Sequence, residues 1–92
     1  MTITLQIGNS DNKLDQEQWS MFVKAIKDRL DHKHINIHFS GGSVNSAPWQ
    51  NWCWVIDIDM YEYDILKSDI LDIRIDFLQD SVAWTEGETK FI

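Results

Sequence analysis

Short stretches in which apolar and polar residues alternate are the strongest constraint on how this chain folds. Thr2–Ile7 reads TITLQI, with isoleucine and leucine at every second position. Period-two patterns rich in β-branched residues indicate half-buried strands. The pattern returns in His34–Phe39 and Trp52–Met60 and, over a shorter length, in Ser81–Thr85. The sequence therefore predicts four strands.

A long connection follows the second predicted strand. Alternation in His34–Phe39 predicts that Ile35, Ile37 and Phe39 face inward. The stretch Ser40–Gln50 that follows contains two adjacent glycines and the one proline of the chain. A connection of roughly a dozen residues is longer than most hairpin loops and is more often functional.

One helix is predicted over about residues 15–31. Asp15 is a favourable N-cap, and Gln18 follows three residues later, as in a capping box. Leu14 and Trp19 occupy the two positions of a hydrophobic staple. From there apolar residues recur at helical spacing and define one buried face.

Residues 64–80 fit two patterns. The apolar residues of the second half alternate as in a strand, but the length is ordinary for a helix and long for a strand. We therefore favour a helix, with Asp64 as its N-cap and with Leu71, Ile75 and Leu78 as a second apolar patch outside the buried face. The helix would also gather four acids on one edge: Asp69, Asp72, Asp76 and Asp80.

This element order predicts the fold class. A chain of 92 residues holds one domain, and the order β-α-β-β-α-β is that of a ferredoxin-like α+β sheet with two helices on one face. The other face of such a sheet stays open. A homodimer would use this open face or Thr2–Ile7 as an edge strand.

The charge excludes several classes of function. Acids exceed bases by 15 to 8, a net charge of −7. Residues 1–46 hold five of each, so the excess lies in residues 47–92. Direct binding of nucleic acid or of an anionic membrane surface needs Lys and Arg instead. No apolar run approaches the length of a membrane span, and the N-terminus does not read as a signal peptide. A cytoplasmic protein is expected.

No residue pattern indicates catalysis or metal binding. His34 and His38 on a strand would lie roughly 13 Å apart, too far to share one ion. Cys53 is the single cysteine, so no disulfide framework exists, and no nucleophile signature surrounds it. Asp57 and Asp59 are interpreted as part of a solvated sheet face. The sequence predicts no enzyme, no metal site and no cofactor.

Three of the five tryptophans lie within residues 48–54. Trp49 and Trp52 flank the amides Gln50 and Asn51. Tryptophan is enriched in binding hot spots, and an aromatic ring beside amides can clamp a planar ligand. These four residues are a candidate binding loop, and packing at the edge of the core is the alternative.

Three blocks resemble a group of short, uncharacterised bacterial and phage proteins. They read IGNSD at residues 7–11, PWQN with CW at residues 48–54, and DSVAWTEGET at residues 80–89. The likeness extends over nearly the whole chain and brings no known activity. Small acidic proteins in such genomes often antagonise a larger protein by binding it, and the resemblance implies that context.

Two functional hypotheses follow. The first is a non-enzymatic inhibitor of a bacterial defence or toxin protein, of the anti-defence or immunity type. Its acidic helix edge would occupy a basic, nucleic-acid-binding surface of the partner protein. A solvated helix face is the simpler reading of the same acids. The second hypothesis is a protein that binds or sequesters a nucleotide-like small molecule through the Trp/Gln/Asn loop. A minimal enzyme that uses Cys53, a histidine or the Asp57 and Asp59 carboxylates is disfavoured, because no set of catalytic residues is complete in the sequence.

Overall fold

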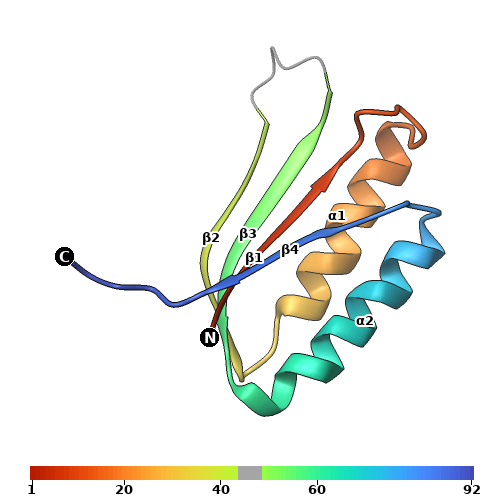
Figure 1. The fold of residues 1–92 in the computed structure, drawn as a ribbon. Coiled ribbons are helices and arrows are strands. Elements are labelled where there is room, and N and C mark those ends of the chain that lie inside the picture. Colours follow the sequence, from red (N-terminus) through yellow and green to blue (C-terminus); the bar gives the residue numbers. More distant parts are fainter. Residues whose placement is uncertain (44–48) are drawn as a thin grey trace.

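The computed structural model describes residues 1–43 and 49–92 and is shown as a ribbon in Figure 1. Strands and helices follow one another in the predicted order β-α-β-β-α-β, with one turn of 3-10 helix, η1, before the second helix. The elements are β1 (Thr2–Gly8), α1 (Gln16–Leu30), β2 (Ile35–Gly42), β3 (Asn51–Ile58), η1 (Met60–Glu62), α2 (Tyr63–Asp76) and β4 (Ala83–Gly87).

The four strands form one antiparallel sheet in the order β2-β3-β1-β4. Both helices cover the same face of this sheet (Figure 1), so the predicted α+β fold is confirmed. β1 lies between β3 and β4. The expectation that Thr2–Ile7 forms an edge strand is therefore wrong, and the two edges are β2 and β4.

The face of the sheet that points away from the helices carries mainly uncharged side chains, most of them small. We call it the open face. Asp57 is the one charged residue that the strand register places there, and the α-amino group of Met1 lies 3.1 Å from its carboxylate. The residues of the open face are Thr2, Thr4, Gln6, Gly8, Asn36, Phe39, Gly41, Asn51, Cys53, Val55, Asp57, Ala83, Thr85 and Gly87.

The core lies between the other sheet face and the two helices. Trp54 and Phe22 are its largest fully buried side chains. The ring of Phe22 stacks on Phe77 with a centroid separation of 5.1 Å, which joins α1 to the end of α2. Trp19 and Trp54 are buried in it as well. Burial of these side chains is the main term that holds the layers together.

The start of α1 shows why the sequence forms a helix there. The Asp15 carboxylate accepts a 2.8 Å hydrogen bond from the backbone N–H of Gln18. The Gln18 side chain in turn accepts a 2.9 Å bond from the backbone N–H of Asp15. This is the predicted capping box, and it satisfies two backbone donors that a helix start leaves free.

Strand β2 departs from the prediction. The register shifts between Ile37 and Phe39, which is a β-bulge. The bulge turns Phe39 to the open face, where its ring covers Gly41: a Cβ on that glycine would lie 2.8 Å from the ring. Ile37 is 43% exposed and Phe39 55% exposed, so neither is buried as expected.

The predicted loop Ser40–Gln50 is also shorter than expected. β2 continues through Gly41 and Gly42 because aromatic rings take the space where other residues would place their side chains. Residues 44–48 of the predicted loop, with Pro48, lie outside the described residues.

The helical interpretation of residues 64–80 is confirmed, but its limits differ. α2 begins at Tyr63, so Asp64 is an acid of the first turn and not the N-cap. The helix ends at Asp76, and Asp80 therefore lies beyond it. The predicted strand Ser81–Thr85 is placed two residues later, at Ala83–Gly87.

Candidate binding surfaces

The outer side of α2 exposes a row of apolar side chains. Leu71 is 47% exposed, Ile75 54% and Leu78 81%. Leu71 and Ile75 are four residues apart and therefore lie next to each other on the helix surface. Leu78 follows two residues after the last residue of α2. Together with the exposed acids Asp64, Asp72 and Asp76, they define what we call the α2 surface.

The predicted acidic edge is only partly free. Asp69 accepts a 2.6 Å hydrogen bond from the Arg29 guanidinium on α1. Asp80 lies 3.2 Å from the Lys13 ammonium. Asp72 and Asp76 make no ion pair with any cation of the described chain. Two of the four predicted acids thus remain free.

The cations of α2 are turned toward the fold. The Lys67 ammonium donates a 3.1 Å hydrogen bond to the Tyr63 hydroxyl and lies 5.4 Å from the Trp84 ring centre. Hydrogen bonding to Tyr63 raises the pKa of Lys67. The Arg74 guanidinium donates to the backbone carbonyls of residues 79 and 80, at 3.1 and 2.7 Å. Both charges are held by local partners, and the acids of the α2 surface are left facing outward.

Leu78 holds a backbone conformation that leucine disfavours. Its φ is +55°, in the left-handed region. The backbone N–H of Leu78 donates to the carbonyl of Ile75, and that of Gln79 donates to Arg74, both at 3.0 Å. This is the Schellman motif, in which glycine usually occupies the position of Leu78.

A leucine at this position costs roughly 1 kcal/mol. With 81% of its surface exposed, the Leu78 side chain contributes little burial in return. Backbone strain of this kind clusters at functional sites, which makes Leu78 a candidate functional residue. The absence of a glycine after the helix was visible in the sequence, but it indicates strain only once the helix end is known.

A hollow of about 340 Å³ lies between α2 and the edge strand β4. Ile70 and Leu71 line it from the helix, and Val82 and Trp84 line it from the other side. It adjoins the exposed apolar row through Leu71. The α2 surface therefore combines apolar side chains, a recess beside them and unpaired carboxylates.

In the predicted Trp/Gln/Asn loop, the side chains of Gln50 and Trp52 are hydrogen-bonded within the fold. The amide group of Gln50 accepts a 3.1 Å hydrogen bond from the Asn9 side chain and donates a 2.8 Å bond to the Gln16 side chain. The backbone N–H of Asn9 also donates to the carbonyl of Gln50, at 2.9 Å. Gln50 thus ties the turn after β1 to the start of α1 and β3.

Trp52 is likewise held by its neighbours. Its ring covers Gly42, where an added Cβ would lie 2.5 Å from a ring carbon. Its indole N–H donates a 3.0 Å hydrogen bond to the Ser40 hydroxyl. Trp49 is 49% exposed. Of the four predicted residues, Asn51 and Trp52 line a hollow on the open face, whereas Trp49 and Gln50 do not.

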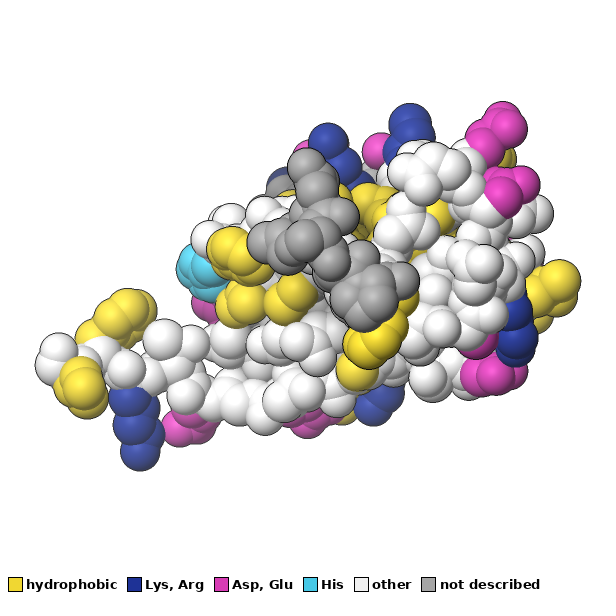
Figure 2. All heavy atoms as spheres, turned by 90° about the horizontal axis from the view of Figure 1, so that it is seen from above, with side chains coloured by type: hydrophobic (Ala, Val, Ile, Leu, Met, Phe, Trp, Pro, Cys, Tyr) yellow, Lys and Arg dark blue, Asp and Glu magenta, His cyan; other side chains and the backbone are white. Residues whose placement is uncertain are grey.

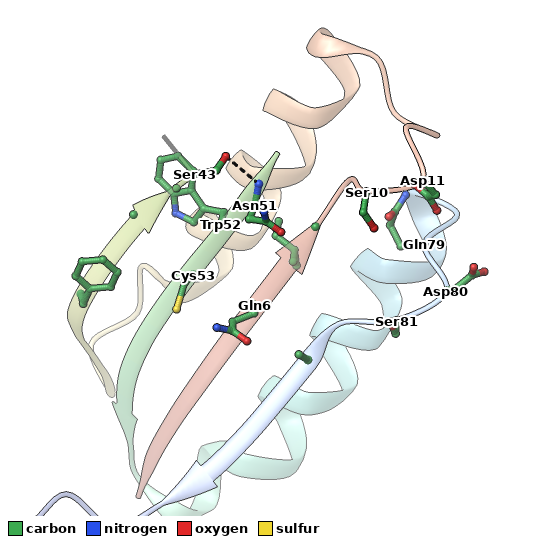
Figure 3. Close-up of a pocket in the computed structure, with 16 residues that line it drawn as sticks. Gln6, Ser10, Asp11, Ser43, Asn51, Trp52, Cys53, Gln79, Asp80 and Ser81 are labelled. Atoms are coloured by element: carbon green, nitrogen blue, oxygen red, sulfur yellow. Dashed lines mark hydrogen bonds between the residues drawn. The ribbon is translucent and has the colours of Figure 1, made fainter. Parts of the chain in front are cut away.

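That hollow has a volume of about 730 Å³ and reaches from the open face to the turn after α2. Figure 3 shows Gln6 and Cys53 side by side on neighbouring strands, with Asp80 and Ser81 across from them. The lining mixes amide and hydroxyl groups with apolar side chains such as Phe39 and Trp52.

The charges at the rim of this hollow are unsuited to a phosphate group. Asp11 and Asp80 stand there, and both lie near the Lys13 ammonium, at 3.6 and 3.2 Å. The hydrogen bond to Asp80 and the charge of that carboxylate raise the pKa of Lys13. The cation is already neutralised, so a nucleotide phosphate would meet carboxylates without a free counter-charge.

A polar cluster that the sequence did not predict lies at the opposite end of the sheet. The buried Glu62 carboxylate is 3.5 Å from the Arg29 guanidinium and 3.7 Å from His32. His34 lies 3.3 Å from Asp59, and its backbone N–H donates to His32 Nδ1 at 3.1 Å. Residues 1–43 and 49–92 contain no group of His, Cys, Asp and Glu arranged to hold a metal ion. We interpret the cluster as a structural junction of α1, β2 and α2.

Neither the protein-family models nor the curated proteins give a match to the chain. Within the part of the chain that the structure describes, neither helix is long and apolar enough to cross a membrane.

Proposed function

We propose that this protein acts by binding a basic partner protein through the α2 surface. The observation that carries the proposal is Leu78, a strained and exposed leucine at the end of an apolar row. An exposed apolar row beside unpaired acids is typical of a contact surface that combines an apolar centre with charged surroundings. The hollow beside Leu71 would accept an apolar side chain of the partner.

Charge supports a cationic partner. The two nearest cations, Lys67 and Arg74, are held by partners in the fold, so a bound protein would meet Asp64, Asp72 and Asp76. Complementary charges of this kind speed the encounter of two proteins and suppress wrong partners.

Binding alone would be enough to inhibit. A protein that uses its basic surface to hold nucleic acid would lose access to that surface when the α2 surface occupies it. The protein would then be an inhibitor of a bacterial defence or toxin protein, as the sequence suggested. No catalytic group of this chain takes part, and no cofactor is needed.

The experiment is affinity capture from a bacterial lysate, followed by binding measurements with the purified captured protein. We expect the double variant D72K/D76K to lose binding by at least tenfold, and binding by the wild type to weaken as salt is added. A second variant, L71S/I75S, tests the apolar row at unchanged net charge.

The matched control is E17K/E88K, which changes the net charge equally on exposed residues elsewhere. It should bind as the wild type does, apart from a modest loss of long-range attraction. Equal binding by wild type and D72K/D76K to the purified partner would contradict the proposal, provided that circular dichroism shows both to be folded.

A further inference from the structure

We propose that the open face is the interface of a homodimer, in which two copies pack sheet against sheet. The proposal is independent of the α2 surface, because the two helices lie on the opposite side of the sheet from the open face (Figure 1).

Two copies of this chain repel each other, because each carries a net charge of −7. A self-contact is favourable only where that charge is absent. The strands of the open face meet this condition best: Asp57 is their one carboxylate and is accompanied at 3.1 Å by the α-amino group of Met1. Carboxylates at the rim of the face are Asp11 and Asp80, which share the Lys13 ammonium, and Glu88. The helix side of the molecule carries the free acids of the α2 surface and would bring like charges together.

The side chains of the open face suit contact with a second sheet. Thr4, Cys53 and Val55 are half-buried already and project little from the strands. Small side chains let two sheets approach to about 10 Å, the usual distance of face-to-face packing. The Phe39 side chain on β2 projects beyond these small side chains and is 55% exposed. The partner copy would cover it.

The size of the face is compatible with a small dimer. Four strands about 4.8 Å apart, each up to eight residues long at about 3.3 Å per residue, span roughly 20 by 25 Å. This is about 500 Å² in projection, and β4 is shorter than the other strands. The flat face is therefore smaller than the about 800 Å² that each partner buries in a standard interface, and side-chain relief and the C-terminal tail would have to supply the rest.

The C-terminal tail adds further apolar surface. Phe91 is 95% exposed and, with Val55 and His38, lines a second hollow of about 690 Å³. The tail is anchored by a 2.7 Å hydrogen bond between the hydroxyls of Thr2 and Thr89. Figure 2 shows it projecting from the body of the molecule on the left, where a second copy could cover it.

Sedimentation equilibrium of the full chain tests the proposal over a concentration range that extends to that of an NMR sample. We expect the wild type to approach the dimer mass. Thr4→Glu places a carboxylate at the centre of the face in both copies, and we expect this variant to be monomeric. Met21→Glu makes the same charge change on α1, at a side chain that is 55% exposed, and should remain dimeric. A monomeric wild type, or a dimeric Thr4→Glu variant, would overturn the proposal.

The single cysteine gives a second measurement that needs no variant. Cys53 lies on the open face and is half-buried. In the dimer its thiol would be covered, so its rate of alkylation should fall several-fold as the protein concentration rises. A rate independent of concentration would contradict the interface even if a dimer formed elsewhere. A negative result in either dimer experiment would not contradict the proposed function of the α2 surface, because that function is tested by partner binding.

Discussion

Arg29 on α1 and Asp69 on α2 are joined by a hydrogen bond of 2.6 Å between the guanidinium and the carboxylate. The same guanidinium lies 3.5 Å from the buried carboxylate of Glu62. Arg29 thus interacts with two acids, Asp69 on α2 and Glu62 in η1. It removes Asp69 from the acidic edge that the sequence suggested, and it provides the counter-charge for Glu62.

This arrangement predicts unequal effects of removing the two partners. Arg29→Ala leaves the Glu62 carboxylate buried without its cation, and we expect a loss of about 3 kcal/mol in the free energy of unfolding. Asp69→Asn removes a half-exposed partner and should cost less than about 1 kcal/mol. Urea denaturation of both variants measures the difference. Equal losses would show that Glu62 does not depend on Arg29.

We expect Leu78 to lower the stability of the fold but to favour binding of the partner. Leu78→Gly relieves the left-handed backbone, and we expect the free energy of unfolding to rise by roughly 1 kcal/mol. The same variant removes an exposed apolar side chain from the α2 surface and should bind the partner less well. Leu78→Ala is the control, because it loses the side chain but keeps most of the backbone cost. A Leu78→Gly variant less stable than the wild type would show that the side chain packs in the fold.

Two glycines predict a contrast in steric tolerance. A Cβ on Gly42 would lie 2.5 Å from the Trp52 ring, whereas a Cβ on Gly87 would meet nothing within 4 Å. Gly42→Ala should therefore cost about 1–3 kcal/mol, since the ring must move. Gly87→Ala should stay within about 0.5 kcal/mol of the wild type. Thermal unfolding of the two variants checks this, and a tolerant Gly42 would mean that Trp52 is free to move.

Glu86 predicts a local pH dependence. Hydrogen bonds from the Tyr63 hydroxyl and the Trp84 indole lower the pKa of its carboxyl group. A lowered pKa in the folded state stabilises the protein above the ordinary glutamate range, and the contribution is lost as the pH falls through the lowered value. Tyr63→Phe should move the pKa of Glu86 upward, toward the ordinary value.

Carbon-detected NMR of the Glu86 carboxyl during an acid titration measures this shift directly. Because Trp84 still donates its hydrogen bond in the Tyr63→Phe variant, we expect the return to be partial. The stability difference between wild type and variant should shrink as the pH drops below the usual glutamate range. An unchanged Glu86 titration would show that Tyr63 is not the main cause.

The parts of the fold that follow from local rules were predictable. The capping box of Asp15 and Gln18 involves neighbours in the chain, and the alternation of β1 follows from burial of one sheet face. The bulge in β2 was not predictable in this way, because it depends on a ring covering Gly41 and on pairing with β3. Strand order was wrong for β1 for the same reason: alternation shows that a face is buried but does not identify the neighbouring strands.

The candidate surfaces were predictable only in part. The helical spacing of Asp72 and Asp76 correctly placed them on one exposed side of α2. The pairing of Asp69 with Arg29 and of Asp80 with Lys13 joins residues far apart in the sequence, so no spacing rule reveals it. For Gln50 and Trp52, the sequence showed residue types suited to binding, but their hydrogen bonds to Asn9 and Ser40 use them to hold strand ends together.

The central place of β1 has a consequence for how the chain folds. Ile3 pairs with Ile56 on one side and with Glu86 on the other, so β1 is synthesised well before either of the strands that flank it. α1 forms from local contacts, whereas the sheet requires closure of long loops, which slows folding. Until β4 has been synthesised, β1 would have an unpaired edge. Aggregation of the nascent chain would begin at that edge.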